Sequence, residues 1–68
     1  MSLHQTRVVD EKGSLDDKIR KLRAFLKGEE FKKLDRAEQL RLLRQDCIME
    51  LYSEVLGERI AAFEPDAA

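Results

Sequence analysis

Residues 35–63 contain the sequence feature that most constrains the fold, a long segment with no proline and a single glycine. Its apolar side chains recur at three- and four-residue spacing, which is the period of an α-helix with one face buried. The first stripe of these side chains consists of Leu40, Leu43, Cys47, Leu51 and Val55. The segment is therefore predicted to form one long helix.

The apolar surface of this helix is wider than one partner helix can cover. At about 100° per residue, a second stripe adjoins the first and consists of Leu42, Met49, Tyr52, Leu56, Ile60 and Phe63. The polar strip that remains consists of Asp46, Glu50, Ser53 and Gly57. An apolar face much wider than about 100° needs more than one neighbour. Because the chain offers only one other long helix, the remaining neighbours are expected to be other copies.

The first part of the chain, from about residue 5 to 27, carries a narrower apolar stripe. This pattern is typical of a helix that packs along one seam. Gly13 interrupts the stripe, and Ser14 with Asp17 has the spacing of a new helix start. Two alternatives follow, a single helix bent at most near Gly13 or a true break there. The single helix is favoured because the apolar residues stay in phase across the glycine, namely Val8, Leu15, Ile19, Leu22 and Leu26.

Residues 28–34 are predicted to connect the two helices. Gly28 is expected to end the first helix as a left-handed residue. Phe31 and Leu34 are three residues apart, the spacing of a single helical turn. Asp35 has the side chain and position of a helix N-cap. A connection this short places the two long helices antiparallel.

These elements predict an all-α fold, an antiparallel two-helix hairpin with a short connector that assembles into a homo-oligomeric helical bundle. The whole chain, residues 1–68, forms one domain, with the second helix at about 35–63 in the centre and the first helix outside it. Residues 64–68 are predicted to be disordered, and Pro65 to end the second helix. Assembly is also favoured by size, because 68 residues barely form a sufficient core.

Charge and composition argue against several classes of function. Lys and Arg number 13 against 14 Asp and Glu, whereas a non-specific nucleic-acid or membrane-surface binder normally has a basic excess. The sequence has neither an apolar run of the about 20 residues that span a membrane nor the apolar segment of a signal peptide. The expected location is therefore cytoplasmic, with Cys47 as a small core residue in a reducing compartment.

The chain also lacks the usual patterns of catalysis. One His and one Cys cannot build a common zinc site. The sequence contains neither a glycine-rich phosphate loop nor a Ser, His and Asp set for nucleophilic catalysis. We therefore expect no enzyme activity, no metal and no cofactor.

Cationic side chains inside the apolar surface are the most informative feature for function. Arg41 and Arg59 lie on nearly the same face of the second helix as Ile48 and Tyr52, with Gln45 nearby. A guanidinium next to an aromatic ring and an amide can hold a phosphate or carboxylate and stack a planar base. The structural alternative is that these arginines pair with acidic residues of another copy across the oligomer interface.

Lys12 falls within the apolar stripe of the first helix. At such a position a lysine packs its stem and extends its amine to water. The alternatives are that it pairs with an acidic residue or that it holds an anion. Together with Arg7, Lys12 is included among the predicted ligand-binding residues, which are Arg7, Lys12, Arg41, Gln45, Tyr52 and Arg59.

Dispersed residues along nearly the whole chain resemble a family of small, largely uncharacterised tailed-phage proteins that includes relatives in crAss-like phages. The matching residues are His4, Gln5, Arg7, Val8, Val9, Glu11, Lys12, Leu15, Lys18, Ile19, Leu22, Phe25, Phe31, Leu34, Gln45, Met49, Tyr52, Leu56, Arg59 and Ile60. The resemblance implies a phage or prophage source and transfers no catalytic residue.

In size and architecture the chain is also similar to phage sponge proteins, small helical oligomers that sequester cyclic nucleotide signals between subunits. This likeness is at the level of the fold alone. It leads to the hypothesis of a phage accessory protein that counters host defence by sequestering a small anionic signal. Arg7, Lys12, Arg41 and Arg59 would supply charge, Tyr52 a stacking surface and Gln45 a hydrogen bond to a base edge. The alternatives are a helical module that inhibits a host protein and a structural phage assembly helper.

Overall fold

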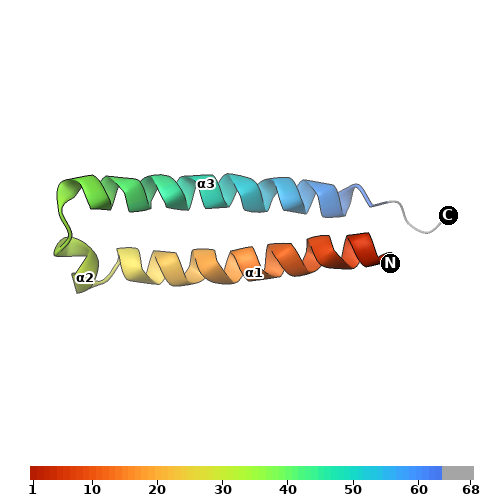
Figure 1. Cartoon of the computed structure of the whole chain (residues 1–68), viewed down its shortest axis with the longest axis horizontal. Coiled ribbons are helices and arrows are strands. Elements are labelled where there is room, and N and C mark those ends of the chain that lie inside the picture. The colour runs from red at the N-terminus through yellow and green to blue at the C-terminus, as the bar shows by residue number, and fades with distance from the viewer. Residues whose placement is uncertain (64–68) are drawn as a thin grey trace.

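A computed structural model describes residues 1–63, and the elements in this range are helices. Helix α1 spans Leu3–Leu26, α2 spans Glu29–Lys32, and α3 spans Arg36–Ala61. The two long helices lie side by side and antiparallel, with α2 at the end where the chain turns (Figure 1). The all-α prediction is confirmed, but the connector contains a helical turn of its own, so the described chain has three helices and not two.

Helix α1 begins with a reciprocal pair of hydrogen bonds at its N-terminus. Ser2 Oγ accepts a bond from the backbone N–H of Gln5, and the Gln5 side chain accepts one from the backbone N–H of Ser2. This pair satisfies two of the N–H groups that a helix start leaves without partners. The helix then continues through Gly13 without a break. The alternative of a fresh helix start at Ser14 is therefore wrong.

The turn between the long helices differs from the expectation at one glycine. Gly28 has φ −93° and ψ 173°, an extended conformation that any residue can adopt, and it caps the start of α2. The prediction that Gly28 ends α1 as a left-handed residue is wrong, because Lys27 ends α1 with helical dihedral angles. The ring of Phe31 in α2 packs edge-on against Phe25 of α1, with centroids 6.4 Å apart. Asp35 caps α3 by accepting the Glu38 N–H at 2.8 Å.

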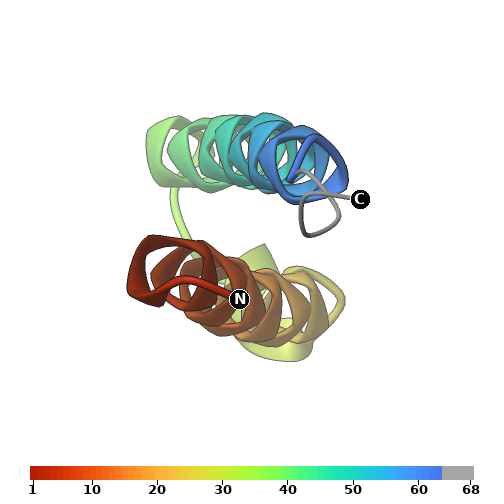
Figure 2. The ribbon, with the colours of Figure 1, turned by 90° about the vertical axis from the view of Figure 1, so that its right-hand side faces the viewer.

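The core between α1 and α3 is small. Val8, Leu15 and Ile19 of α1 are buried against Leu56 of α3, and Leu56 is fully buried. Three half-buried side chains extend this cluster, namely Met49, Ile60 and Phe63. Figure 2, which looks along the helices, shows that they form a single pair, so α3 has one helix beside it and a free opposite side. The predicted tail, residues 64–68 with Pro65, lies outside the described residues.

The free side of α3 carries the first apolar stripe of the sequence. Leu40, Leu43, Leu51 and Val55 are each between 45% and 61% exposed. Cys47, predicted as a core residue, is exposed within the chain because this stripe points away from α1. Tyr52 belongs to the second stripe of the sequence, and it is also exposed. We call this side the outer face of α3, formed by Leu40, Leu43, Cys47, Ile48, Leu51, Tyr52 and Val55.

Candidate functional site

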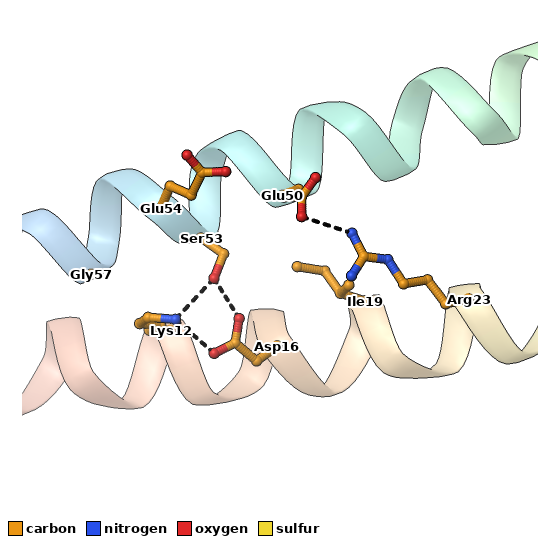
Figure 3. A pocket seen from close by; sticks show the side chains of 8 residues that line it. All are labelled: Lys12, Asp16, Ile19, Arg23, Glu50, Ser53, Glu54 and Gly57. Atoms are coloured by element: carbon orange, nitrogen blue, oxygen red, sulfur yellow. Dashed lines mark hydrogen bonds and ion pairs between the residues drawn. The ribbon is translucent and has the colours of Figure 1, made fainter.

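A cluster of three polar side chains joins the two long helices near the middle of the molecule. Lys12 Nζ donates hydrogen bonds to Asp16 Oδ2 at 2.8 Å and to Ser53 Oγ at 2.9 Å. Ser53 Oγ in turn donates to Asp16 Oδ1 at 2.5 Å. Lys12 and Asp16 are one helical turn apart on α1, and Ser53 meets them from α3 (Figure 3). We call Lys12, Asp16 and Ser53 the polar cluster.

Gly57 provides the space through which Lys12 reaches α3. A Cβ atom at position 57 would lie 3.3 Å from Lys12 Cε, closer than most carbon contacts. Gly57 lies one turn after Ser53. Because it has no side chain, the stem of Lys12 can cross the helix interface to reach Ser53. Gly57 belongs to the polar strip predicted for this helix, and the structure places it in the lining of the site.

An ion-pair group lies next to the polar cluster. Arg23 of α1 donates from Nε to Asp46 Oδ1 at 2.8 Å, and its Nη2 lies 3.3 Å from Glu50 Oε1. Figure 3 shows Arg23 reaching from α1 toward Glu50 of α3. Because both carboxylates belong to α3, the contact fixes how the two helices are aligned along their length.

Within each of the two groups, the charged side chains stabilise one another. The pKa of the Asp16 carboxyl lies below its ordinary value, first because of the hydrogen bond from Lys12 and then because of the one from Ser53. The pKa of the Arg23 guanidinium is raised, chiefly by its hydrogen bond to Asp46. Each ionised group is therefore stabilised by a partner on its own or the facing helix.

An open cavity of about 340 Å³ lies between the helices at this position. Two cationic and three acidic side chains line it, so its charge balance is unfavourable for an anion unless a carboxylate is displaced. The lining residues are Lys12, Asp16, Ile19, Arg23, Glu50, Ser53, Glu54 and Gly57.

The contact between a serine hydroxyl and a lysine amine has the elements of a nucleophile and its base. The bonding within the polar cluster works against that chemistry. The Lys12 amine is paired with the Asp16 carboxylate, and the Ser53 proton is directed at that carboxylate and not at the amine. The cluster therefore favours helix alignment over catalysis.

The structure divides the predicted ligand-binding residues between two places. Lys12 lies in the cavity between α1 and α3 and pairs with an acid, one of the alternatives left open for it. Arg41, Gln45, Tyr52 and Arg59 are exposed on α3, and their spacing places them on one side of that helix. This side is about 80° to 120° from Ser53, so one chain does not bring Lys12 to these four residues.

The local contacts of the exposed residues are few. Arg41 donates from Nε to Glu38 at 2.7 Å, and Gln45 lies 3.7 Å from the Met49 sulfur. Arg7 is exposed on α1, at the end of the hairpin where α3 carries Arg59. The contacts of Arg41 and Gln45 are both made within α3, and neither reaches α1.

Three residues of the central site, Asp16, Ser53 and Gly57, were missed as site residues. Asp46, Glu50, Ser53 and Gly57 form the predicted polar strip of α3, but Ser53 is buried and Asp46 pairs across the interface. Part of this strip faces α1, because a polar side chain can pack when a partner on another helix satisfies it. The sequence signal that could have revealed the central site is Lys12, a lysine within the apolar stripe of α1.

Within residues 1–63 the structure contains neither a group of acidic, histidine or cysteine residues able to hold a metal ion nor a helix long and apolar enough to cross a membrane.

The fold and its contacts define a small all-helical protein in which the polar cluster joins two long helices and the outer face of α3 is exposed. The model of the Sequestin family matches residues 2–62. Because the match covers most of the chain, the protein belongs to the Sequestin family. No curated protein and no solved structure matches the chain.

Proposed function

We propose that this protein is a non-enzymatic phage accessory protein that counters host defence by sequestering a small anionic signal, such as a cyclic nucleotide, at interfaces between its subunits. The family name is consistent with a sequestering role. The single observation that carries the proposal is the row of Arg41, Gln45, Tyr52 and Arg59 on one side of α3, beside apolar residues that α1 leaves uncovered.

The chemistry of this row suits a nucleotide. Arginine binds phosphate through paired N–H donors, and its plane stacks on aromatic rings. Tyr52 is 44% exposed, so part of its ring is accessible to a base. Gln45 carries a donor and an acceptor one turn from Arg41 and two turns from Tyr52. The apolar neighbours supply the water-excluding surface that a binding pocket needs.

The central cavity plays a different part in this proposal. Its carboxylates outnumber its cations, and the polar cluster satisfies its own hydrogen bonds. Lys12 thus aligns α1 with α3 and supports the outer face without touching the ligand. Arg7 remains a candidate contact from α1, since its end of the hairpin carries Arg59.

Native mass spectrometry tests the proposal directly. Protein expressed in a bacterial host is measured before and after addition of cyclic di-AMP, cyclic di-GMP and cyclic tri-AMP. The proposal expects an oligomer that gains a whole number of one nucleotide, and expects Arg59→Ala to lose it. A matched control is Lys18→Ala, which removes an exposed cation of α1. An oligomer that ignores all three nucleotides contradicts this function.

The outer face also favours a second function, a helical module that binds and inhibits a host protein. Contiguous exposed apolar residues along a helix are typical of helix-in-groove recognition. This function predicts a one-to-one complex with a host protein whose formation is abolished by Leu51→Ala and unaffected by Arg59→Ala. Pull-down with these two variants separates the two functions. A structural phage assembly helper, whose function would be the oligomer itself, predicts neither complex.

A further inference from the structure

Four residues of the outer face of α3 and two charged neighbours form a row with the spacing of a helix-pairing seam. They are each exposed and follow one another at intervals of three or four residues. We call this row the outer seam, formed by Leu40, Arg44, Cys47, Leu51, Val55 and Glu58. It lies opposite to the side of α3 that packs on α1.

The exposed area of the chain exceeds that of a compact protein of the same mass. The accessible surface is 5321 Å². A compact monomer of 7.9 kDa exposes about 4,400 Å², so the excess is about 900 Å². A standard interface buries about 800 Å² on each partner. The excess area is therefore sufficient for one stable interface with a second copy.

The charges on this side of α3 select an orientation for that second copy. Its N-terminal part carries Arg36 and Arg44, and its C-terminal part carries Glu54 and Glu58. A parallel pair of α3 helices would place like charges beside each other at both ends, which is unfavourable. An antiparallel pair places Arg44 of one copy opposite the glutamates of the other. Charge complementarity along the outer seam thus favours the antiparallel pair, whereas the arginines at positions 41 and 59, which this pair brings together, need an anion between them.

We propose that two copies pair α3 against α3 in antiparallel orientation, with the two-fold axis near residues 49–51, and that the pair completes two equivalent anion sites. Each site combines Arg41 of one copy with Arg59 of the other. With the axis at that position, Arg41 lies level with residues 57–61 of the second copy, which include Arg59. The identity of the ligand rests on the proposed function, whereas the pairing does not.

A single chain cannot form this site. Arg41 and Arg59 are 18 residues apart, which is about 27 Å along a helix. Both lie about 80° from the outer seam in the same direction. A two-fold axis perpendicular to both helices leaves the arginines of both copies on the same side of the pair. Arg41 of one copy then lies beside Arg59 of the other. In a parallel pair the same arginines would lie on opposite sides.

The chemistry of the completed site fits a ligand with more than one negative charge. Two guanidinium groups from different chains can each take one phosphate, as in a cyclic dinucleotide. Tyr52 and Gln45 lie on the same side, between the two arginine pairs. Arg41 contacts Glu38 through Nε only, so its terminal amino groups can still bind an anion.

Cross-linking tests the pairing without any ligand. In a Cys47→Ala background, Arg41→Cys and size-tagged Arg59→Cys chains are unfolded, mixed, refolded and treated with a short bis-maleimide. The expected product is a hetero-dimer of the two chains, whereas Arg41→Cys alone should cross-link little because its two cysteines lie about 27 Å apart. In the control, a Lys18→Cys chain, whose cysteine is exposed on α1, takes the place of one of the two cysteine variants in the mixture. A mixture that yields no hetero-dimer overturns the proposal.

Mixed subunits test whether the two arginines share one site. Arg41→Ala and Arg59→Ala proteins are each expected to bind cyclic dinucleotides at least about tenfold more weakly than wild type. After remixing, half of the dimers contain both variants and hold one intact site, so about a quarter of wild-type capacity should return. No recovery overturns the shared site. If wild type binds no nucleotide while the hetero-dimer cross-links, the pairing is supported and the proposed function fails.

Discussion

The Ser53 hydroxyl accepts a hydrogen bond from Lys12 Nζ at 2.9 Å across the interface of α1 and α3. Ser53 is only 8% exposed, and it also donates to Asp16 at 2.5 Å. A polar group at this depth is unfavourable in any register that removes its partners. The polar cluster therefore specifies one alignment of the two helices, which the few apolar core residues would specify weakly by themselves.

Ser53→Ala is expected to lower the free energy of unfolding by about 0.5–1.5 kcal/mol. The substitution leaves Lys12 and Asp16 with each other but removes the hydroxyl that joins them to α3. Urea unfolding followed by circular dichroism measures the change. Ser14→Ala is the control, since it removes an exposed hydroxyl from α1 and should not destabilise. Equal unfolding curves for Ser53→Ala and wild type would contradict a stabilising polar cluster.

Gly57→Ala should stabilise the protein less than Gly13→Ala does. Alanine is favoured over glycine within a helix by about 1 kcal/mol, and nothing lies within 4 Å of a Cβ at Gly13. At Gly57 the added Cβ would meet Lys12 Cε at 3.3 Å. The flexible lysine stem can shift, but it then moves away from Ser53.

A double-mutant cycle isolates that contact. If Lys12 limits the gain at position 57, Gly57→Ala in a Lys12→Ala background should recover the stabilisation seen for Gly13→Ala. Free energies of unfolding from urea titrations give all four corners of the cycle. A gain at position 57 that is the same with and without Lys12 would show that the glycine is not needed for the lysine to cross.

Helix positions could be predicted from the sequence because they depend on local information. The spacing of Val8, Leu15 and Ile19 set the packed face of α1, and the structure buries all three. Asp35 could be identified as a helix cap because a cap depends on residues only three positions away. The spacing of Phe31 and Leu34 indicated the helical turn that α2 forms. The extended backbone of Gly28 was less accessible, since it depends on how the chain must turn between two packed helices.

The central site could not be predicted in the same way, because its contacts join residues far apart in sequence. Ser53 bonds to Asp16, 37 positions away, and Lys12 bonds to Ser53 over 41. Hydropathy assigns Ser53 and Gly57 to solvent. In the structure the Ser53 hydroxyl bonds to Lys12, and the absence of a side chain at Gly57 leaves room for the lysine stem. The width of the apolar surface on α3 was informative, because the structure leaves one of its two stripes exposed.

Acid should remove the contribution of Asp16 to stability. Its pKa is lowered, first by the hydrogen bond from Lys12, so the contribution is complete above the unfolded pKa of about 3.9. It is lost as the pH falls through the lower native pKa. The difference in free energy of unfolding between wild type and Asp16→Asn should therefore shrink below about pH 4 and stay constant above about pH 5.

Urea unfolding at several pH values provides the comparison. Asp10→Asn serves as the control, since it removes an exposed carboxylate from the same helix. Asp17 also has a lowered pKa, chiefly through Lys21, but it is present in wild type and in both variants and so cancels. A difference between wild type and Asp16→Asn that does not change with pH would show that the polar cluster does not hold the ionised carboxylate.

Leu56→Ala and Leu51→Ala make the same chemical change on opposite sides of α3. Leu56 is fully buried, and truncating such a residue costs about 2–5 kcal/mol, comparable to the whole stability of a small domain. Leu56→Ala should therefore lose most of its helical circular dichroism at 25 °C. Leu51 is 61% exposed, so its removal should leave the helix pair of one chain intact.

The two leucines should differ in a second measurement. If a second copy covers the outer face, Leu51→Ala removes a central apolar contact and shifts the protein toward monomer in size-exclusion chromatography with light scattering. Its helical signal should remain near that of wild type when measured at high concentration. An oligomer unchanged by Leu51→Ala would mean that Leu51 is not at the interface, and the antiparallel pairing of α3 would then be untenable.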